Sequence, residues 1–361
     1  MTKWLSPALL AIFALLACNE IAAPRPNGVG APGEIVVVAD TNTWKGPVGD
    51  ALRSVLGRSV APPLGGLSDF SLVRRDLTNE NFNLLRNLRH IVFAAALDDT
   101  SNVARFLEAR LDSTGTRLVR SGEGTVVLTR PDLWANNQMV VLATAGTDSL
   151  LAAAIRANAD TLRKAYTELS LEATQRDMFS RGRQQEIEEE LLERHGFAVT
   201  VQHDYFISQD TTLTVDNREG HFVRLRRVLS DTWRDYFVYY EEIDPTFPID
   251  STRMERVTDA ALEQFVRGEY DSSFVEIDRI RPVSSEPVVI NGRDAVQYRG
   301  LWRMTEEFMG GPFVRYVFVD ESQQRMYIFF GMIFAPQHRF RGQKREFLRQ
   351  LEVTARTFRT L

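Results

Sequence analysis

The residues able to do acid–base or metal chemistry are scattered along the 361-residue chain. Its five histidines occur singly, and the chain has neither a His-Glu-x-x-His motif nor a Gly-x-Ser-x-Gly motif. His195 and His203 lie on either side of a predicted strand start, where they could approach a metal ion together with Asp204. Structural histidines are the simpler interpretation, so we expect no metal, no cofactor and no catalytic residue.

Adjacent acidic residues, such as Glu241-Glu242 and Glu306-Glu307, occur in the sequence. General acid–base chemistry needs carboxylates that reach the same reacting group. Neighbouring residues on a strand point to opposite faces of the sheet. Neither pair is therefore expected to act as an acid and base together.

An aromatic and methionine-rich stretch, Trp302–Phe313, is the best candidate for recognition, and we call it the aromatic loop. Gly-Gly-Pro is expected to interrupt a strand and to permit close backbone approach. Aromatic and methionine side chains are common at recognition surfaces, but they also fill cores. We expect Trp302 and Phe313 to be buried, and Phe308 and Met309 to be exposed. The candidate residues are Trp302, Met304, Phe308, Met309, Gly310, Gly311 and Phe313.

The first half, residues 34–182, reads as an α/β domain that ends in a long helical stretch. Continuous apolar runs at 35–39, 90–96 and 139–143 predict buried strands. A polar loop at 40–43 and a helix beginning at Pro47 are expected after the first strand. Residues 117–129 are expected to form a hairpin, and Gly182 to interrupt the helical stretch.

The second half, residues 183–361, reads as an antiparallel sheet packed by helices on one side, which makes the chain α+β overall. Strands are expected at 222–228, 236–240, 294–302, 312–319 and 325–334, and a final helix with Phe347, Leu351, Ala355 and Phe358 on one face. The alternating pattern of 222–228 predicts a sheet that is wet on one face.

The N-terminus has the anatomy of a secretory signal, with Lys3, an apolar run and small residues before Cys18. The run is too short for a permanent span, which takes about 20 apolar residues. Leu15-Leu16-Ala17-Cys18 resembles the lipobox of bacterial lipoproteins, which implies cleavage after residue 17 and lipid on Cys18. The alternative is an ordinary secretory signal with an incidental cysteine. Residues 18–33, rich in proline and glycine, are then expected to be a disordered tether.

Composition narrows the partners. The formal net charge is −5, which argues against nucleic acid. Asn19 follows the cysteine where an aspartate would favour inner-membrane retention, so we expect the outer membrane, facing the periplasm. The expected partners are the membrane, through lipid on Cys18, and an envelope protein, peptide, lipid or glycan.

Several short motifs together resemble one family. They are Gly300-Leu301-Trp302, Met309-Gly310-Gly311-Pro312-Phe313, Ala335-Pro336, Arg349-Gln350-Leu351-Glu352 and Thr357-Phe358, with Trp44, Trp134 and Gln138 in the first half. This pattern is similar to uncharacterised lipoproteins of Bacteroidetes-type bacteria that carry a domain of unknown function. The resemblance implies no activity, cofactor or catalytic residue.

These observations favour a membrane-anchored envelope lipoprotein that acts as a non-enzymatic binding or accessory module. The alternative is a hydrolase of an envelope polymer, with its site in a cleft between the two halves.

Overall fold

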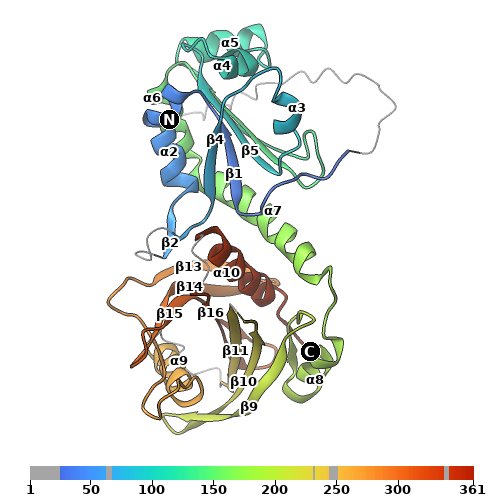
Figure 1. Ribbon diagram of the computed structural model, residues 1–361, viewed down its shortest axis with the longest axis vertical. Coiled ribbons are helices and arrows are strands. Elements are labelled where there is room, and N and C mark those ends of the chain that lie inside the picture. The colour runs from blue at the N-terminus through green and yellow to red at the C-terminus, as the bar shows by residue number, and fades with distance from the viewer. Residues whose placement is uncertain (1–24, 62–66, 231, 244–250, 337–340) are drawn as a thin grey trace, which may run out of the picture. The chain divides into compact units, whose positions relative to one another are not determined.

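The computed structural model describes residues 25–61, 67–230, 232–243, 251–336 and 341–361 (Figure 1). They form two compact units: residues 25–58 and 70–170 in the first, and the described residues of 59–69 and 171–361 in the second. The predicted signal peptide, residues 1–17, and Cys18 lie outside the described residues. Within these ranges, every helix is too short or too polar to cross a bilayer. The α+β class and the antiparallel second half are confirmed.

The first unit is a three-layer α/β structure around a sheet of order β4-β1-β5-β7-β6. Its strands are β1 (Glu34–Val38), β4 (Ser71–Arg75), β5 (His90–Ala96) and β7 (Met139–Ala145), all parallel, and the antiparallel β6 (Val126–Pro131). One face is covered by α2 (Pro47–Leu56), α6 (Asp148–Ala157) and the start of α7 (Ala159–Phe179). The other is covered by α3 (Phe82–Leu85) and α4 (Asn102–Glu108). Helices on both faces explain why β5 and β7 are buried throughout.

Two local predictions in this unit are wrong, and a helix cap explains each. Residues 40–43 are not a loop: the Asp40 side chain accepts from the amides of Asn42 and Thr43 and begins α1 (Thr41–Lys45). Residues 117–120 are not a hairpin strand but the end of α5 (Ser113–Arg120), which Asp112 caps by accepting from the Gly115 amide at 2.6 Å. In both places, a short side chain supplied a helix start that the apolar pattern did not reveal.

The predicted disordered tether is wrong for residues 27–29. Asn27 bridges to Asn136 and Val29 bridges to Leu88, so this segment is paired with the first unit. The Gly28 amide donates to Asn136 O at 2.8 Å. A Cβ on Gly28 would lie 3.0 Å from Asn137 O, so glycine permits the close approach. Backbone pairing thus compensates for the small apolar content of this segment.

The second unit is built on a curled antiparallel sheet of order β12-β14-β15-β16-β11-β10-β9, with β13 also pairing with β14 (Figure 1). The strands are β9 (Phe206–Val215), β10 (Arg218–Val228), β11 (Trp233–Glu242), β12 (Val275–Ile277), β13 (Ser284–Ile290), β14 (Arg293–Met304), β15 (Gly310–Asp320) and β16 (Arg325–Phe334). Its helices within the described residues are the end of α7, from Leu171 on, and α8 (Gln185–His195), α9 (Ser251–Phe265) and α10 (Arg341–Arg356). Gly182, at φ +110°, separates α7 from α8 as predicted.

Both faces of the central strands of this sheet, β11, β15 and β16, are buried. Tyr327 and Phe329 of β16 pack with α10 on one face, and Ile328 and Phe330 pack with α9 on the other. The α9 side is therefore an addition to the predicted helix layer. The expectation of a wet face is wrong, because Arg224 of β10 is buried on the α9 face.

A buried ion pair fixes α9 to the sheet. Arg253 of α9 donates through Nε to Glu241 Oε1 of β11 at 2.7 Å, and the Tyr239 hydroxyl donates to Glu241 Oε2 at 2.7 Å. Glu241 is almost fully buried, whereas the side chain of Glu242 is exposed, as expected for neighbours on a strand. Holding α9 in place also positions the segment that follows it, residues 266–269.

Candidate ligand-binding site

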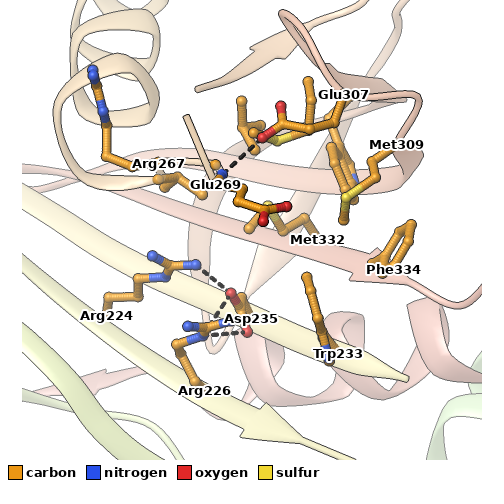
Figure 2. Close-up of a pocket in the computed structure, with 15 residues that line it drawn as sticks. Arg224, Arg226, Trp233, Asp235, Arg267, Glu269, Glu307, Met309, Met332 and Phe334 are labelled. Atoms are coloured by element: carbon orange, nitrogen blue, oxygen red, sulfur yellow. Dashed lines mark hydrogen bonds and ion pairs between the residues drawn. The ribbon is translucent and has the colours of Figure 1, made fainter. Parts of the chain in front are cut away.

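A cavity of about 360 Å³ lies on the α9 face of the second sheet (Figure 2). Small-molecule sites commonly occupy about 300–1,000 Å³ and combine apolar walls with a few polar groups. This cavity has that composition. Its residues come from β10, β11, β14 and β16, from the segments after α9 and β14, and from β12.

The apolar wall is formed by aromatic and methionine side chains: Trp233, Trp302, Met304, Met309, Met332 and Phe334. The Trp233 and Phe334 rings lie 5.1 Å apart, tilted by 47°. Trp302 is buried and donates through Nε1 to Ile333 O at 3.1 Å, so its ring orientation is fixed. Trp233 is 38% exposed, which leaves part of its surface available to a ligand. Fixed aromatic rings and adaptable thioethers suit a ligand with an apolar body.

Two arginines and an aspartate form a charged group in the cavity lining (Figure 2). Arg224 donates to Asp235 and, through NH1, to Phe265 O at 3.1 Å. Arg226 Nε lies 3.0 Å from Asp235 Oδ2. Burial lowers the pKa of Arg224, and the neighbouring Asp235 carboxylate opposes that shift. A single carboxylate thus neutralises only one of two guanidinium groups.

Two glutamates line the cavity elsewhere. Glu307, in the turn after β14, accepts from the Glu269 amide at 2.8 Å and from the Ser273 hydroxyl, and the Ser273 bond is the main cause of its lowered pKa. These bonds tie the β14–β15 turn to the segment after α9. The Glu269 carboxylate makes no hydrogen bond or ion pair in the described part of the chain, and Figure 2 shows it near Met332.

The structure brings only part of the aromatic loop into the cavity. Trp302, Met304 and Met309 line it, whereas Phe308 is fully exposed outside it. Phe313 is buried, stacked on Phe330 at 5.0 Å. The predictions for Trp302, Phe313 and Phe308 are confirmed, whereas Met309 is only half-exposed.

The Gly-Gly-Pro segment was expected to interrupt a strand, but it forms the start of β15 instead. Gly310 begins β15 and pairs with Arg303, and Gly311 pairs with Trp302. A Cβ on Gly311 would meet Ile333 O at 1.9 Å, so glycine lets β15 pass close to β16. The two glycines thus serve strand pairing, and the turn itself is residues 305–309.

His195, His203 and Asp204, which the sequence suggested could approach one metal ion, do not form such a site in the structure. His195 contacts the Tyr240 hydroxyl at 3.1 Å and Asp210 Oδ2 at 3.3 Å, whereas Asp204 accepts from Arg227 at 2.6 Å. No set of three or more potential metal ligands occurs among the described residues. Burial lowers the pKa of His195, against the opposing effect of Asp210.

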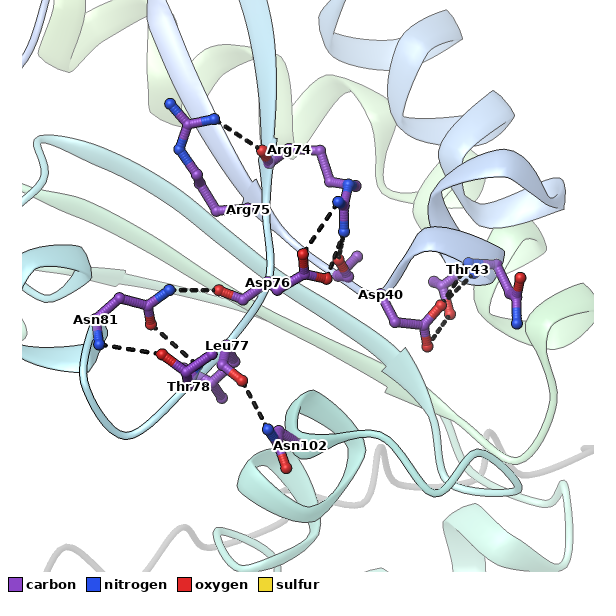
Figure 3. A network of polar contacts seen from close by, with 11 residues as sticks. Asp40, Thr43, Arg74, Arg75, Asp76, Leu77, Thr78, Asn81 and Asn102 are labelled. Atoms are coloured by element: carbon purple, nitrogen blue, oxygen red, sulfur yellow. Dashed lines mark hydrogen bonds and ion pairs between the residues drawn. The ribbon is translucent and has the colours of Figure 1, made fainter.

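Polar residues also gather in the first unit, at the carboxyl ends of its parallel strands (Figure 3). Arg74 NH2 donates to Asp76 Oδ2 at 3.1 Å, and Asn81 Nδ2 donates to Asp76 O at 2.8 Å. Asn102 reaches Leu77 O at 2.8 Å. Ligands of open α/β sheets bind at such ends. Here the contacts are internal and hold the segment after β4 against α4.

The glycines after β1 serve packing as well. A Cβ on Gly49 would lie 1.8 Å from Trp44 O, so this glycine allows α1 and α2 to meet.

The sequence did not identify Arg224, Arg226, Trp233 and Asp235 as site residues. The sequence signal for this group was Arg224 and Arg226, which occupy alternate positions of a strand with apolar residues between them. This alternation was interpreted as a strand with one face in contact with solvent. Arg224 is buried there because Asp235, on the neighbouring strand, supplies a partner.

Comparison with known families divides the chain in two. Residues 184–357 match a domain of unknown function, DUF4837, and residues 28–179 match another, DUF8532. No curated protein matches the chain. The cavity lies within the DUF4837 match.

Proposed function

We propose that this protein is a lipid-anchored envelope lipoprotein of the Bacteroidetes type, whose second unit is a non-enzymatic binding module. The anchor is lipid on Cys18, and the mature protein lies on the outer membrane facing the periplasm. Support for the anchor comes from Leu15-Leu16-Ala17-Cys18 and from the motifs around Gly310-Gly311 that resemble such lipoproteins.

The cavity on the α9 face carries the binding proposal. It combines a partly exposed Trp233, a fixed Trp302 and flexible methionines with a charged group that is balanced internally except for one arginine. Burying apolar surface stabilises a protein by about 25 cal/mol per Å², so apolar side chains are usually covered by other parts of the core. In this cavity, an apolar ligand of modest size would cover them and gain the free energy of burial.

Calorimetric titration tests the proposal on the full chain, reconstituted in lipid nanodiscs. The probe is hydrocinnamamide, a neutral and water-soluble aromatic amide. Trp233→Ala is expected to weaken binding about tenfold or more, since it removes a large apolar contact. Phe308→Ala is the matched control, because this aromatic residue belongs to the same region of the fold but lies outside the cavity.

Three results would count against this assignment. Absence of binding would remove the cavity as a site. Loss of binding in Phe308→Ala, with Trp233→Ala unaffected, would move recognition to the tip of the aromatic loop. Cleavage of an envelope polymer by the purified chain would favour the hydrolase alternative.

A further inference from the structure

We infer that the ligand of this cavity is an apolar molecule that carries a carboxylate, held by the unoccupied end of the Arg226 guanidinium. The inference rests on the proposed binding function and names the chemical class of its ligand. It follows from the hydrogen-bond partners of the three charged residues on β10 and β11.

Arg226 is only half engaged. Its Nε contacts both Asp235 oxygens, at 3.2 Å to Oδ1 and 3.0 Å to Oδ2. Its two terminal nitrogens make no hydrogen bond or ion pair within the described ranges. The side chain is 29% exposed and lines the cavity. A planar guanidinium presents paired N–H groups that match a carboxylate in a two-point contact.

Arg224 adds a second unsatisfied donor. It is 9% exposed, and its Nε is buried without a hydrogen-bond partner in the part of the chain that the structure describes. Its terminal nitrogens are used by Asp235 and Phe265 O. An uncompensated buried donor is costly, which favours a ligand that brings an acceptor.

The charges set the orientation of the ligand. Arg224, Arg226 and Asp235 together carry one net positive charge, so this end of the cavity is complementary to one anion. Glu307 already accepts hydrogen bonds, whereas the Glu269 carboxylate accepts none within the described residues. A carboxylate is therefore expected against Arg226, with the apolar body along Trp233 and Phe334. Any N–H or O–H group of the ligand would find its acceptor at Glu269.

Two sources share this chemistry: a fatty acid, and the carboxyl-terminal residue of a peptide. Decanoate represents the first, and N-acetyl-glycyl-phenylalanine represents the second, each compared with its own amide. The source that binds more tightly identifies the natural ligand class, and a preference for the acid in either arm supports the inference.

The test compares hydrocinnamate with hydrocinnamamide on the full chain in nanodiscs, which isolates the carboxylate. The wild type is expected to prefer the acid about tenfold, as charged hydrogen bonds allow. Arg226→Gln is expected to remove that preference, because it should weaken binding of the acid about tenfold and binding of the amide less. Arg226→Lys keeps the charge but loses the two-point contact, so it should fall between the two.

Arg303→Gln is the matched control. Arg303 is on β14, half exposed, and pairs with Glu276 rather than lining the cavity. It should bind both ligands as the wild type does. Equal binding of acid and amide, or a preference that survives Arg226→Gln, would overturn the inference alone. Failure of both ligands to bind would overturn the proposed function too. Melting curves identify any variant that fails to fold.

Discussion

Arg226 lies directly across the β10–β11 ladder from Asp235, and its Nε is 3.0 Å from Asp235 Oδ2. Directly opposed residues of an antiparallel pair share one face of the sheet. The strand register therefore places this pair on the same face as Phe222 and Phe237, against α9. That placement puts the two arginines and Asp235 at one end of the cavity.

Removing Asp235 should be strongly destabilising. Asp235→Ala leaves the buried Arg224 without its carboxylate, and breaking such a pair costs about 3–5 kcal/mol. Asp50→Ala breaks an exposed pair with Arg53 and should cost at most about 1 kcal/mol. Urea unfolding measures both changes. If Asp235→Ala lowers the free energy of unfolding no more than Asp50→Ala does, the buried ion pair adds no stability.

The aromatic loop should divide into a structural and an exposed part. Phe313→Ala removes a fully buried ring and should lower the free energy of unfolding by about 3–5 kcal/mol. Phe308→Ala removes an exposed ring and should stay within about 0.5 kcal/mol. Thermal unfolding of the two variants decides the point. Similar losses in both would contradict the burial described here.

Stability should fall as the pH drops below about 6.5, the ordinary pKa of histidine. Burial holds the pKa of His195 below that value in the folded chain, so the unfolded chain takes up a proton first. His195→Gln should flatten the pH dependence of the unfolding midpoint between pH ~7.5 and ~5.5. The more exposed His203→Gln is the control and should retain the wild-type slope. An unchanged slope in His195→Gln would assign the effect to other groups.

Asp320 should govern stability at lower pH. Burial alone would raise its pKa, but hydrogen bonds from Ser322 and Thr360 and the Arg293 charge hold it at about 2. The ionised group therefore stabilises the fold above its ordinary pKa of 3.8, and this contribution is lost as the pH falls from there towards 2. Asp320→Ala should lower stability at pH ~7 by about 3 kcal/mol and weaken this acid dependence. Equal acid sensitivity in wild type and variant would contradict it.

The proposed anchor predicts an acylated N-terminal cysteine in the mature protein. Mass spectrometry of protein extracted from the envelope should find Cys18 as the first residue, carrying lipid on its sulfur and amine. Cys18→Ala should release the protein from the membrane fraction. An unmodified Cys18, or unchanged fractionation of the variant, would remove the anchor from the account.

The sequence was most informative where a single physical term dominates. Continuous apolar runs at 90–96 and 139–143 identified β5 and β7, because a strand covered on both sides tolerates few polar residues. Gly182 marked the break between two helices by its freedom at positive φ. Helix starts at Asp40 and Asp112 were missed, since a single short side chain decides them.

The site was harder to predict, because its residues meet only through strand order. Arg226 and Asp235 are nine positions apart in the chain. Trp302 and Phe334 line the same cavity from strands β14 and β16, which are far away in the sequence. The motif Gly300-Leu301-Trp302 was noticed for its resemblance to a family. Its glycine has a packing cause, since a Cβ on Gly300 would lie 2.8 Å from the Phe313 ring.

Photoaffinity labelling tests the central claim, that the cavity on the α9 face binds an apolar ligand, most directly. A diazirine derivative of hydrocinnamate is cross-linked to the full chain in nanodiscs, and the labelled peptides are mapped by mass spectrometry. The account predicts label within residues 224–235, 266–269, 302–309 or 332–334 or at Val275, competed by excess hydrocinnamate and reduced in Trp233→Ala. Label confined to other segments, or label that excess ligand does not displace, would contradict it.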